Sequence, residues 1–208
     1  MISGRKVIGF IPAKGISRRV PQKNLAICGG KHLVLWTLDA AHGSKYIDEI
    51  IVSTDENRVS EVIYYHWWNK GPSQRQRLII DKRARYLCEP EVGATDVVLE
   101  YLDRHQGNLS DVIVLLQPTS PVRTSEHIDE AIRLYGCTFC PTVSVSEESG
   151  KVNGAIYIKD VGLLIKSKSF QSGAELWYHM STQESIDVDT FEDLQRAESY
   201  LREKNGRE

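Results

Sequence analysis

Short, continuous apolar runs rich in β-branched residues recur along the chain, and segments with helical periodicity separate them. Such runs are typical of parallel strands that helices cover on both faces, because no position along them faces water. The runs that predict strands are residues 7–11, 49–54, 78–80, 112–116, 142–145 and 155–158. The segments that predict helices are 33–41, 53–56 to about 68, 95–104, 126–135 and from 190 onward. Repeated strand–helix units predict one α/β domain: a single Rossmann-like, mostly parallel open sheet with helices on both faces.

Three expected helices start at residues that can satisfy free backbone N–H groups. Ser53 and Glu56 have the spacing of a capping box, which predicts that the second helix begins there. Thr95 is predicted to cap the third helix, and Thr190 is predicted to open the last one.

The composition is that of an ordinary globular protein and excludes several classes. Of 208 residues, 41% are hydrophobic, which is too many for a disordered chain. Twenty-six basic and 28 acidic residues leave a formal charge of −2, whereas a non-specific nucleic-acid binder needs a large cationic excess. No apolar stretch suits a membrane span, and charged residues rather than a cleavage site follow the run at 7–13. We therefore expect a cytoplasmic protein without nucleic-acid or membrane partners.

Two of the four cysteines, Cys137 and Cys140, form a Cys-x-x-Cys pair that suits half of a zinc site or a redox pair. A structural zinc site needs a second pair of ligands, and the sequence has none at close spacing. A redox pair would open a helix, but the residues after Cys140 predict a strand. We interpret the pair as reduced, half-buried thiols. The six histidines form no metal-binding or triad motif and are given no catalytic role.

A basic loop follows the first predicted strand, at the edge where open α/β sheets bind ligands. Lys14, Arg18, Arg19 and Lys23 fall within ten residues, and Gly15 lets backbone N–H groups approach a ligand. A triphosphate needs this combination of charge and donors, although neither a Walker A nor a dinucleotide-binding glycine motif is present. We interpret the loop as a phosphate site; the alternative is a solvated basic loop.

Polar residues also follow the most apolar predicted strand, at 112–116. A turn stiffened by Pro118 and Pro121 displays Gln117, two hydroxyl groups and Arg123. Such rigidity suits the wall of a pocket, but prolines are also common in plain turns. The residue types alone leave both interpretations open.

Two aspartates near the last predicted helix, Asp187 and Asp189, lie two positions apart. On an extended segment both side chains would face one side, where like charges repel unless a cation joins them. Carboxylate oxygens suit Mg²⁺, which binds one or two carboxylates together with substrate phosphates. The alternative interpretation makes Asp189 an anion at the start of the helix, next to Thr190.

Five segments, in family order, resemble the N-acylneuraminate cytidylyltransferases, the CMP-sialic acid synthetases. They are residues 11–25, 51–55, 115–123, 153–157 and 185–190. The resemblance implies one cytidylyltransferase domain over residues 1–208, with the fold of nucleotide-diphospho-sugar transferases. It implies transfer of CMP from CTP to the anomeric hydroxyl of a sialic acid-like nonulosonic acid, with release of pyrophosphate. Mg²⁺ is the implied cofactor, with Mn²⁺ as the alternative metal.

The resemblance also implies roles for individual residues. Those implied to bind CTP are Ala13, Lys14, Ser17, Arg18, Lys23, Asn24 and Arg83. Those implied to contact the sugar acid are Gln117, Asn153, Tyr157 and Lys151. The implied catalytic residues are Lys14, Lys23, Asp187 and Asp189, of which the two aspartates would bind the metal. Arg85 competes with Arg83 for the place of the base-pocket arginine.

The sequence departs from the family's pattern in two places. Lys14 stands where the family usually has arginine, which keeps the charge but loses bidentate geometry. Arg18 and Arg19 replace a lysine and a glycine. Residues 146–151 are all that remains of the family's dimerisation arm, so we expect a homodimer to be weak or absent. Two alternatives stay open: cytidylyl transfer to 3-deoxy-manno-octulosonate, another ulosonic acid or a sugar 1-phosphate, and CTP binding without catalysis.

Overall fold

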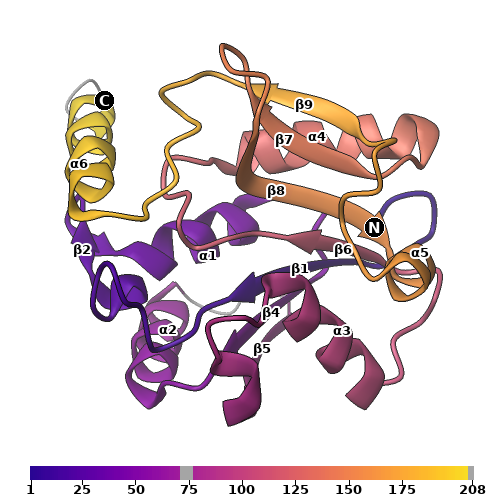
Figure 1. Ribbon diagram of the computed structural model, residues 1–208, viewed down its shortest axis with the longest axis horizontal. Helices are drawn as coiled ribbons and strands as arrows, with labels where there is room; N and C mark the ends of the chain where they lie inside the picture. Colours follow the sequence, from indigo (N-terminus) through magenta and orange to yellow (C-terminus); the bar gives the residue numbers. More distant parts are fainter. Residues whose placement is uncertain (71–76, 206–208) are drawn as a thin grey trace.

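The computed structural model describes residues 1–70 and 77–205, and in this part of the chain seven strands form one sheet (Figure 1). In spatial order they are β5 (Arg77–Lys82), β4 (Glu49–Thr54), β1 (Val7–Pro12), β6 (Val112–Leu115), β8 (Val152–Asp160), β7 (Thr142–Ser146) and β9 (Leu176–Met180). A separate ribbon consists of β2 (Ile27–Cys28) and β3 (Lys31–His32). The predicted α/β fold around one open, mostly parallel sheet is confirmed.

One strand, β8, makes the sheet mixed. The strands β5, β4, β1 and β6 run parallel, as do β7 and β9, but β8 is antiparallel to both of its neighbours. A tight hairpin joins β7 directly to β8, closed by backbone hydrogen bonds from Ser146 N to Lys151 O and from Gly150 N to Ser146 O. Strands joined by such a short loop run antiparallel. The start of β8, with Asn153 and Gly154, therefore lies at the same sheet edge as the carboxyl ends of β1 and β6.

Helices cover both faces of the sheet, as the continuous apolar strands predict. They are α1 (Leu33–Gly43), α2 (Asn57–Asn69), α3 (Ala94–Arg104), α4 (Ser125–Thr138), α5 (Val161–Ser167) and α6 (Phe191–Asn205). The helices α1, α2 and α4 pack on one face, against strand residues such as Ile11 and Ile50. The helices α3 and α5 pack on the other face, against Phe10 and Ile51. Successive residues of one strand thus enter opposite cores, which explains why central strands such as β1 and β6 are apolar along their length.

The last helix, α6, stands beside the small β2–β3 ribbon rather than on the main sheet (Figure 1). A third apolar cluster holds it there: Cys28, Leu33, Val122, Ile186, Val188, Ala197 and Leu201. Leu33 belongs to α1, and Ala197 and Leu201 belong to α6. The other four residues come from three segments that the sequence marks as polar, namely those after β1, after β6 and before α6. Burial of the apolar residues of these segments therefore brings their polar residues together.

The capping box predicted at Ser53 and Glu56 is wrong. The strand β4 continues through Thr54, because Ser53 still pairs with β5. The helix α2 begins only after Glu56, whose carboxylate accepts a hydrogen bond from Arg58 N at 3.2 Å. Ser53 is therefore fully buried within the sheet instead of capping a helix.

The other two predicted helix starts have different outcomes. Gly93 precedes α3, and Asp96 accepts a hydrogen bond from its N–H at 2.8 Å, so Thr95 lies inside the helix and the predicted cap is wrong. The start at Thr190 is confirmed, because α6 begins at the next residue. There Thr190 N donates to Asp193 Oδ2 at 2.9 Å, and Asp193 N donates to Thr190 Oγ1 at 3.2 Å.

The four cysteines are free thiols: Cys137 is exposed at the end of α4, Cys140 and Cys88 are partly buried, and Cys28 is buried. Across residues 1–70 and 77–205, no group of three or more histidine, cysteine or acidic side chains is placed to hold a metal. No helix in that same part of the chain is both long and apolar enough to cross a membrane.

Candidate active site

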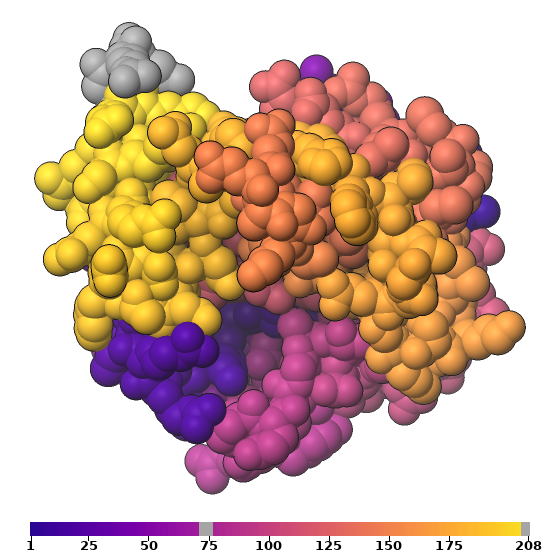
Figure 2. All heavy atoms as spheres, turned by 45° about the horizontal axis from the view of Figure 1, so that its top comes forward, coloured from indigo at the N-terminus to yellow at the C-terminus, as the bar shows by residue number. Residues whose placement is uncertain are grey.

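A cleft of about 420 Å³ opens where the polar segments meet, at the carboxyl ends of β1, β5 and β6. Figure 2 shows it as a hollow between the N-terminal loop, the segment after β5 and the C-terminal third of the chain. Its charged and polar lining residues include Lys14, Ser17, Arg18, Arg19, Lys23, Asn24, Arg83, Gln117, Thr119, Asp187 and Asp189. Residues that lie up to 175 positions apart in the sequence thus share one cavity, as expected for the carboxyl edge of a parallel sheet.

The basic loop after β1 is anchored from two sides. Asp55, after β4, accepts a hydrogen bond from Gly15 N at 2.8 Å, and the Asn24 amide donates to Lys14 O at 2.8 Å. Gly15 also packs so closely that a Cβ there would lie 2.8 Å from Glu56 Cβ. Only glycine fits at that distance, so the close approach of the loop to the start of α2 fixes the loop's path.

Lys23 joins the basic loop to the acidic segment before α6. Its Nζ donates to Val188 O at 2.7 Å and to Asp189 Oδ1 at 3.0 Å. Arg19 Nη1 lies 2.9 Å from the other carboxylate oxygen of Asp189. Two predicted site segments, more than 160 residues apart, are therefore joined by ion pairs across the cleft.

In the acidic segment, residues 185–190, buried and cleft-lining side chains alternate, as expected for an extended segment. Ile186 and Val188 are buried in the third apolar cluster, whereas Asp187 and Asp189 line the cleft. At the start of α6 it is the Asp193 carboxylate that accepts the N–H groups of Asp189 and Thr190, whereas the Asp189 carboxylate pairs with Lys23 and Arg19. Burial raises the pKa of Asp187 above its usual range, and the charge of Asp189 raises it further.

The turn after β6 forms a wall of the cleft, which decides between the two interpretations of its prolines. Gln117, Pro118 and Thr119 line the cavity, and the fully buried Arg123 braces them from behind. Arg123 Nη1 donates to Gln117 O at 3.2 Å and to Ala155 O, in β8, at 2.9 Å. Burial without a carboxylate partner lowers the pKa of Arg123 to about 9.

Beside this wall, Gly154 keeps a space open. Its φ of +80° is a left-handed conformation that favours glycine. A Cβ at this position would lie 3.1 Å from Gln117 Oε1 and 3.8 Å from Asp187 Oδ2. The gap between the Gln117 amide and the Asp187 carboxylate therefore depends on glycine at position 154.

Arg83 and its competitor Arg85 differ sharply in position. Arg83 is buried and lines the cleft, with Nη2 donating to Ser53 O at 2.9 Å. Arg85 is exposed and does not line it. Burial lowers the pKa of Arg83, as expected for a cation withdrawn from water.

Four residues implied by the resemblance do not line the cleft. Ala13 is fully buried behind it, and Lys151 is exposed on the β7–β8 hairpin. Asn153 is buried: its amide donates to Ser185 Oγ at 2.9 Å and accepts from Ser144 Oγ at 2.5 Å. Tyr157 packs against Phe170, and burial followed by the charge of Asp187 raises the pKa of its phenol.

Sequence reasoning missed the apolar half of the cleft. This wall lies in the segment after β5 and at the start of α3, and consists of Cys88, Pro90, Val92, Gly93, Ala94 and Val97. Apolar side chains carry no chemical pattern, so nothing in their types marks a site. Their place after a parallel strand, together with Pro90 and Gly93, is the signal that could have found them.

Comparisons with known proteins agree with this architecture. The family model described as cytidylyltransferase matches residues 8–67. A CMP-N,N'-diacetyllegionaminic acid synthase of Legionella pneumophila is 31% identical over 166 residues, which cover 80% of this chain and 68% of that protein. An N-acylneuraminate cytidylyltransferase of Streptococcus agalactiae is 28% identical over 225 residues, covering 91% of this chain and 52% of that protein. The chain thus spans between about half and two thirds of these relatives' length.

A solved structure extends the likeness to the whole sheet. The CMP:2-keto-3-deoxy-manno-octonic acid synthetase in complex with CTP matches with a TM-score of 0.67 over 96% of this chain and 99% of that one, at 14% identity. The likeness covers the whole α/β fold, and the cationic cleft lies at the carboxyl edge of its sheet. The chain belongs to the cytidylyltransferase family. Its 31% identity to the Legionella synthase, over 68% of that protein's length, establishes this membership.

Proposed function

We propose that the chain transfers CMP from CTP to the anomeric hydroxyl of a sialic acid-like nonulosonic acid and releases pyrophosphate. The observation that carries the proposal is the Lys23–Asp189 ion pair, which holds the basic loop and the acidic pair at one cleft. The cations of the basic loop suit the negative charge of a triphosphate. Phosphoryl transfer requires that the charge on the phosphates is neutralised and that the attacking and leaving oxygens are held in line. The cleft volume of about 420 Å³ lies in the range of small-molecule sites.

The nucleotide is proposed to lie with its base on the apolar wall and its phosphates toward the basic loop. Arg83 stands beside that wall, and a guanidinium donates hydrogen bonds only, which suits the O2 and N3 acceptors of cytosine. Lys14, Ser17 and Arg18 would bind the phosphates from the loop. Asn24 is buried and holds Lys14 O, so we propose that it shapes the loop.

The acceptor is proposed to occupy the gap between Gln117 and Asp187. The glycine at position 154 leaves this space free. Asp187 also lies close enough to Tyr157 for its charge to raise the pKa of the Tyr157 phenol. Asn153 and Lys151 lie outside the cleft lining, so a contact with the sugar acid would require these residues to move or the acceptor to extend beyond the cavity.

The reaction itself demands little covalent chemistry from the chain. The anomeric hydroxyl gives its proton to solvent water and its oxygen bonds to the α-phosphorus. The bond from this phosphorus to the oxygen that bridges it to the β-phosphorus breaks, and pyrophosphate leaves with the electron pair. Lys14 and Lys23 would neutralise charge that develops on the phosphates. No side chain has to form a covalent intermediate, so positioning and electrostatics would carry catalysis.

Asp187 and Asp189 suit a divalent cation in donor chemistry, because both are carboxylates on one side of the cleft. Asp189 is paired with Arg19 and Lys23, which phosphates would attract away, whereas Asp187 forms no salt bridge to any residue in 1–70 or 77–205. We propose that the two aspartates hold Mg²⁺, or Mn²⁺, together with the triphosphate. The metal, when bound, would supply further neutralisation of the phosphate charge.

The choice of acceptor is supported by sequence more than by geometry. The relatives named above are a legionaminic acid synthase at 31% identity and an acylneuraminate enzyme at 28%, and the octonic acid synthetase shares the fold at 14%. This order favours a nonulosonic acid over 3-deoxy-manno-octulosonate, which stays the alternative. The short β7–β8 hairpin supports the second alternative, a CTP-binding protein with impaired catalysis.

Pyrophosphate release tests the proposal. Each of the four nucleoside triphosphates is incubated with Mg²⁺ and one of N-acetylneuraminate, a legionaminate, a pseudaminate or 3-deoxy-manno-octulosonate. We expect release with CTP and a nonulosonic acid only. Release with the octulosonate alone would support the first alternative. CTP binding by calorimetry without release from any acceptor would support the second.

A further inference from the structure

Behind Arg83, a chain of hydrogen bonds runs from the cleft along β4 and β5 to Arg104 at the end of α3. Arg83 donates from Nη2 to Ser53 O at 2.9 Å and from Nε to Ser53 Oγ at 3.4 Å. Ser53 Oγ in turn donates to Asp81 Oδ2 at 2.8 Å. Arg104 Nη2 donates to the other oxygen, Asp81 Oδ1, at 2.8 Å. Four side chains, from β4, β5, the residue after β5 and α3, thus form one network that ends at the cleft.

The middle of this network is closed to water. Ser53 is fully buried, and Asp81 and Arg83 are each only 6% exposed. Ser53 and Asp81 face each other in the register of β4 and β5, so the sheet itself fixes their contact. A buried carboxylate needs partners for its lone pairs, and Ser53 and Arg104 provide one to each oxygen.

The direction of the Ser53 hydrogen bond determines whether the hydroxyl presents a lone pair or a proton to Arg83. A hydroxyl has a single proton, and here that proton points to Asp81. The oxygen of Ser53 therefore turns a lone pair toward Arg83 Nε. With Asp81 neutral or absent, the hydroxyl could rotate and present its proton to the guanidinium instead, which would repel it.

We propose that Asp81 and Arg104 are positioning residues for base recognition: acting through Ser53, they hold the Arg83 guanidinium in the orientation that reads cytosine. Ser53 accepts one N–H from Nε and one from Nη2, so the N–H groups that remain for a ligand are the two on Nη1 and the second on Nη2. The inference rests on the proposed function, because it assumes that the base of CTP lies beside Arg83. No residue of the network other than Arg83 lines the cleft.

The expected selectivity for CTP over UTP follows from the hydrogen-bond donors and acceptors of the two bases. Cytosine offers acceptors at both O2 and N3, whereas uracil has a proton on N3 that opposes a guanidinium. A guanidinium fixed in direction can exploit that difference, but one that is free to rotate can move to O2, which both bases share. Loss of the network should therefore reduce the preference for CTP over UTP more than it reduces turnover at saturating CTP.

Two variants and one matched control test the inference. Asp81→Asn weakens both bonds of the carboxylate, and Ser53→Ala removes the hydroxyl but keeps the carbonyl that holds Nη2. Glu100→Gln is the control, because Glu100 accepts a hydrogen bond from Arg104 Nε at 2.6 Å but forms none with Asp81 or Ser53 in the described part of the chain. For each protein, kcat and KM are measured with CTP and with UTP at saturating acceptor.

We expect the ratio of kcat/KM for CTP to that for UTP to fall about tenfold in Asp81→Asn and Ser53→Ala, through a higher KM for CTP with kcat within about twofold. Glu100→Gln should keep the ratio of the parent. If Asp81→Asn does not fold, Ser53→Ala carries the test alone. An unchanged ratio in the folded variants, or an equal loss in the control, would overturn the inference. A parent chain without preference for CTP would instead overturn the proposed function itself.

Discussion

The ammonium group of Lys23 lies 3.0 Å from the carboxylate of Asp189, although the two residues belong to opposite ends of the chain. The contact forms because apolar neighbours of both segments are buried: Ile186 and Val188 beside α6, and Cys28 in the ribbon after the basic loop. Lys23 is 14% exposed, so it is shielded from water without being removed from the cleft. A cation held in this way can shift between Asp189 and a bound phosphate at small cost.

Lys23→Ala should weaken both CTP binding and turnover. The variant loses a charge-assisted phosphate contact, which contributes about 1.5–3 kcal/mol, so we expect kcat/KM for CTP to fall roughly ten- to a hundredfold. Initial rates of pyrophosphate release measure the change. Lys166→Ala, on the exposed side of α5, removes the same charge far from the cleft and should keep the parent rate. Equal rates in both variants would show that Lys23 of the basic loop does not contribute to CTP binding or turnover.

Asp189→Asn separates a metal ligand from a structural anion. We expect activity to collapse and the melting temperature to change little, because the ion pairs of Asp189 are partly exposed and such pairs contribute little. Asp193→Ala is the matched control: it removes the acceptor at the start of α6 and should lose about 1 kcal/mol of stability while keeping activity. Near-normal turnover of Asp189→Asn at low millimolar Mg²⁺ would refute the metal assignment.

Gly154→Ala should affect the acceptor rather than the nucleotide. The added Cβ would lie 3.1 Å from Gln117 Oε1, in the gap proposed for the sugar acid. We expect a higher KM for the acceptor with an unchanged KM for CTP. Gly173→Ala controls for backbone strain, since Gly173 has a φ of +85° but open space around it. If both variants raise the acceptor KM alike, the gap is not the acceptor site.

The raised pKa of Asp187 makes a prediction about stability and pH. A carboxyl whose pKa is higher in the folded than in the unfolded chain favours folding below its ordinary pKa, and stability is lost as pH rises through the raised value. In buffer with EDTA and no nucleotide, Asp187→Asn should therefore melt above the parent at neutral pH. The difference should shrink as the pH falls toward about 4. Scanning calorimetry of both proteins between about pH 4 and neutral pH measures this difference. A variant that melts below the parent at neutral pH would contradict the prediction.

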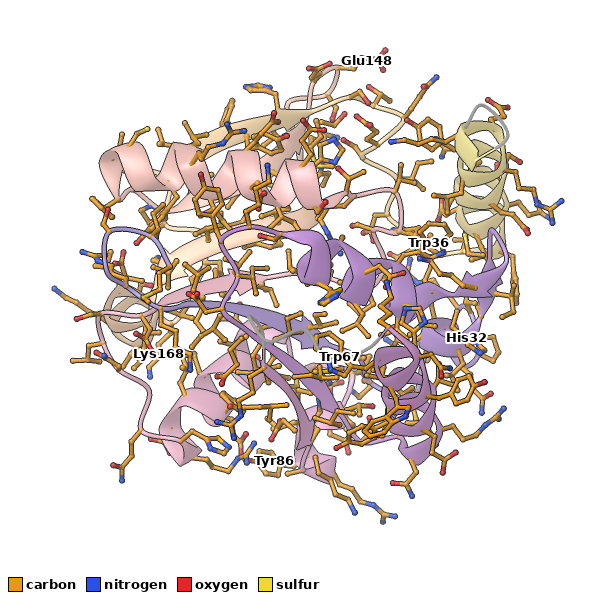
Figure 3. All side chains as sticks on the ribbon, turned by 180° about the vertical axis from the view of Figure 1, so that it is seen from behind. His32, Trp36, Trp67, Tyr86, Glu148 and Lys168 are labelled. Atoms are coloured by element: carbon orange, nitrogen blue, oxygen red, sulfur yellow. The ribbon has the colours of Figure 1, made fainter. Side chains whose placement is uncertain are left out.

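The short β7–β8 hairpin predicts a weak dimer or none. Residues 147–151 are exposed, and Glu148 projects from the hairpin tip (Figure 3). Stable interfaces generally bury at least about 1,000 Å², which so few polar residues do not provide. Light scattering should find a monomer at micromolar concentration. A tight dimer would show that another surface of the chain forms the interface.

The strands were predictable because burial on both faces leaves continuous apolar runs, as in β1 and β6. The strand β9 was not, since it has only five residues and His179, which is exposed, interrupts its apolar run. The charged parts of the site were predictable because Lys23 and Asp187 stand outside apolar segments. The contact between Ser53 and Asp81 was not predictable: the sequence predicts Ser53 as part of a helix cap, and Asp81 follows the strand predicted at 78–80. Only the register of β4 and β5 brings the two together.

Phosphorus-31 NMR of a single reaction tests the central claim most directly. CTP, Mg²⁺ and N-acetylneuraminate are mixed with the chain, and the phosphate resonances are followed with time. We expect the three resonances of CTP to be replaced by one phosphodiester resonance and that of pyrophosphate, at equal rates and only with the sugar acid present. Formation of free CMP with pyrophosphate, of CDP with orthophosphate, or of no product with any nonulosonic acid would contradict cytidylyl transfer.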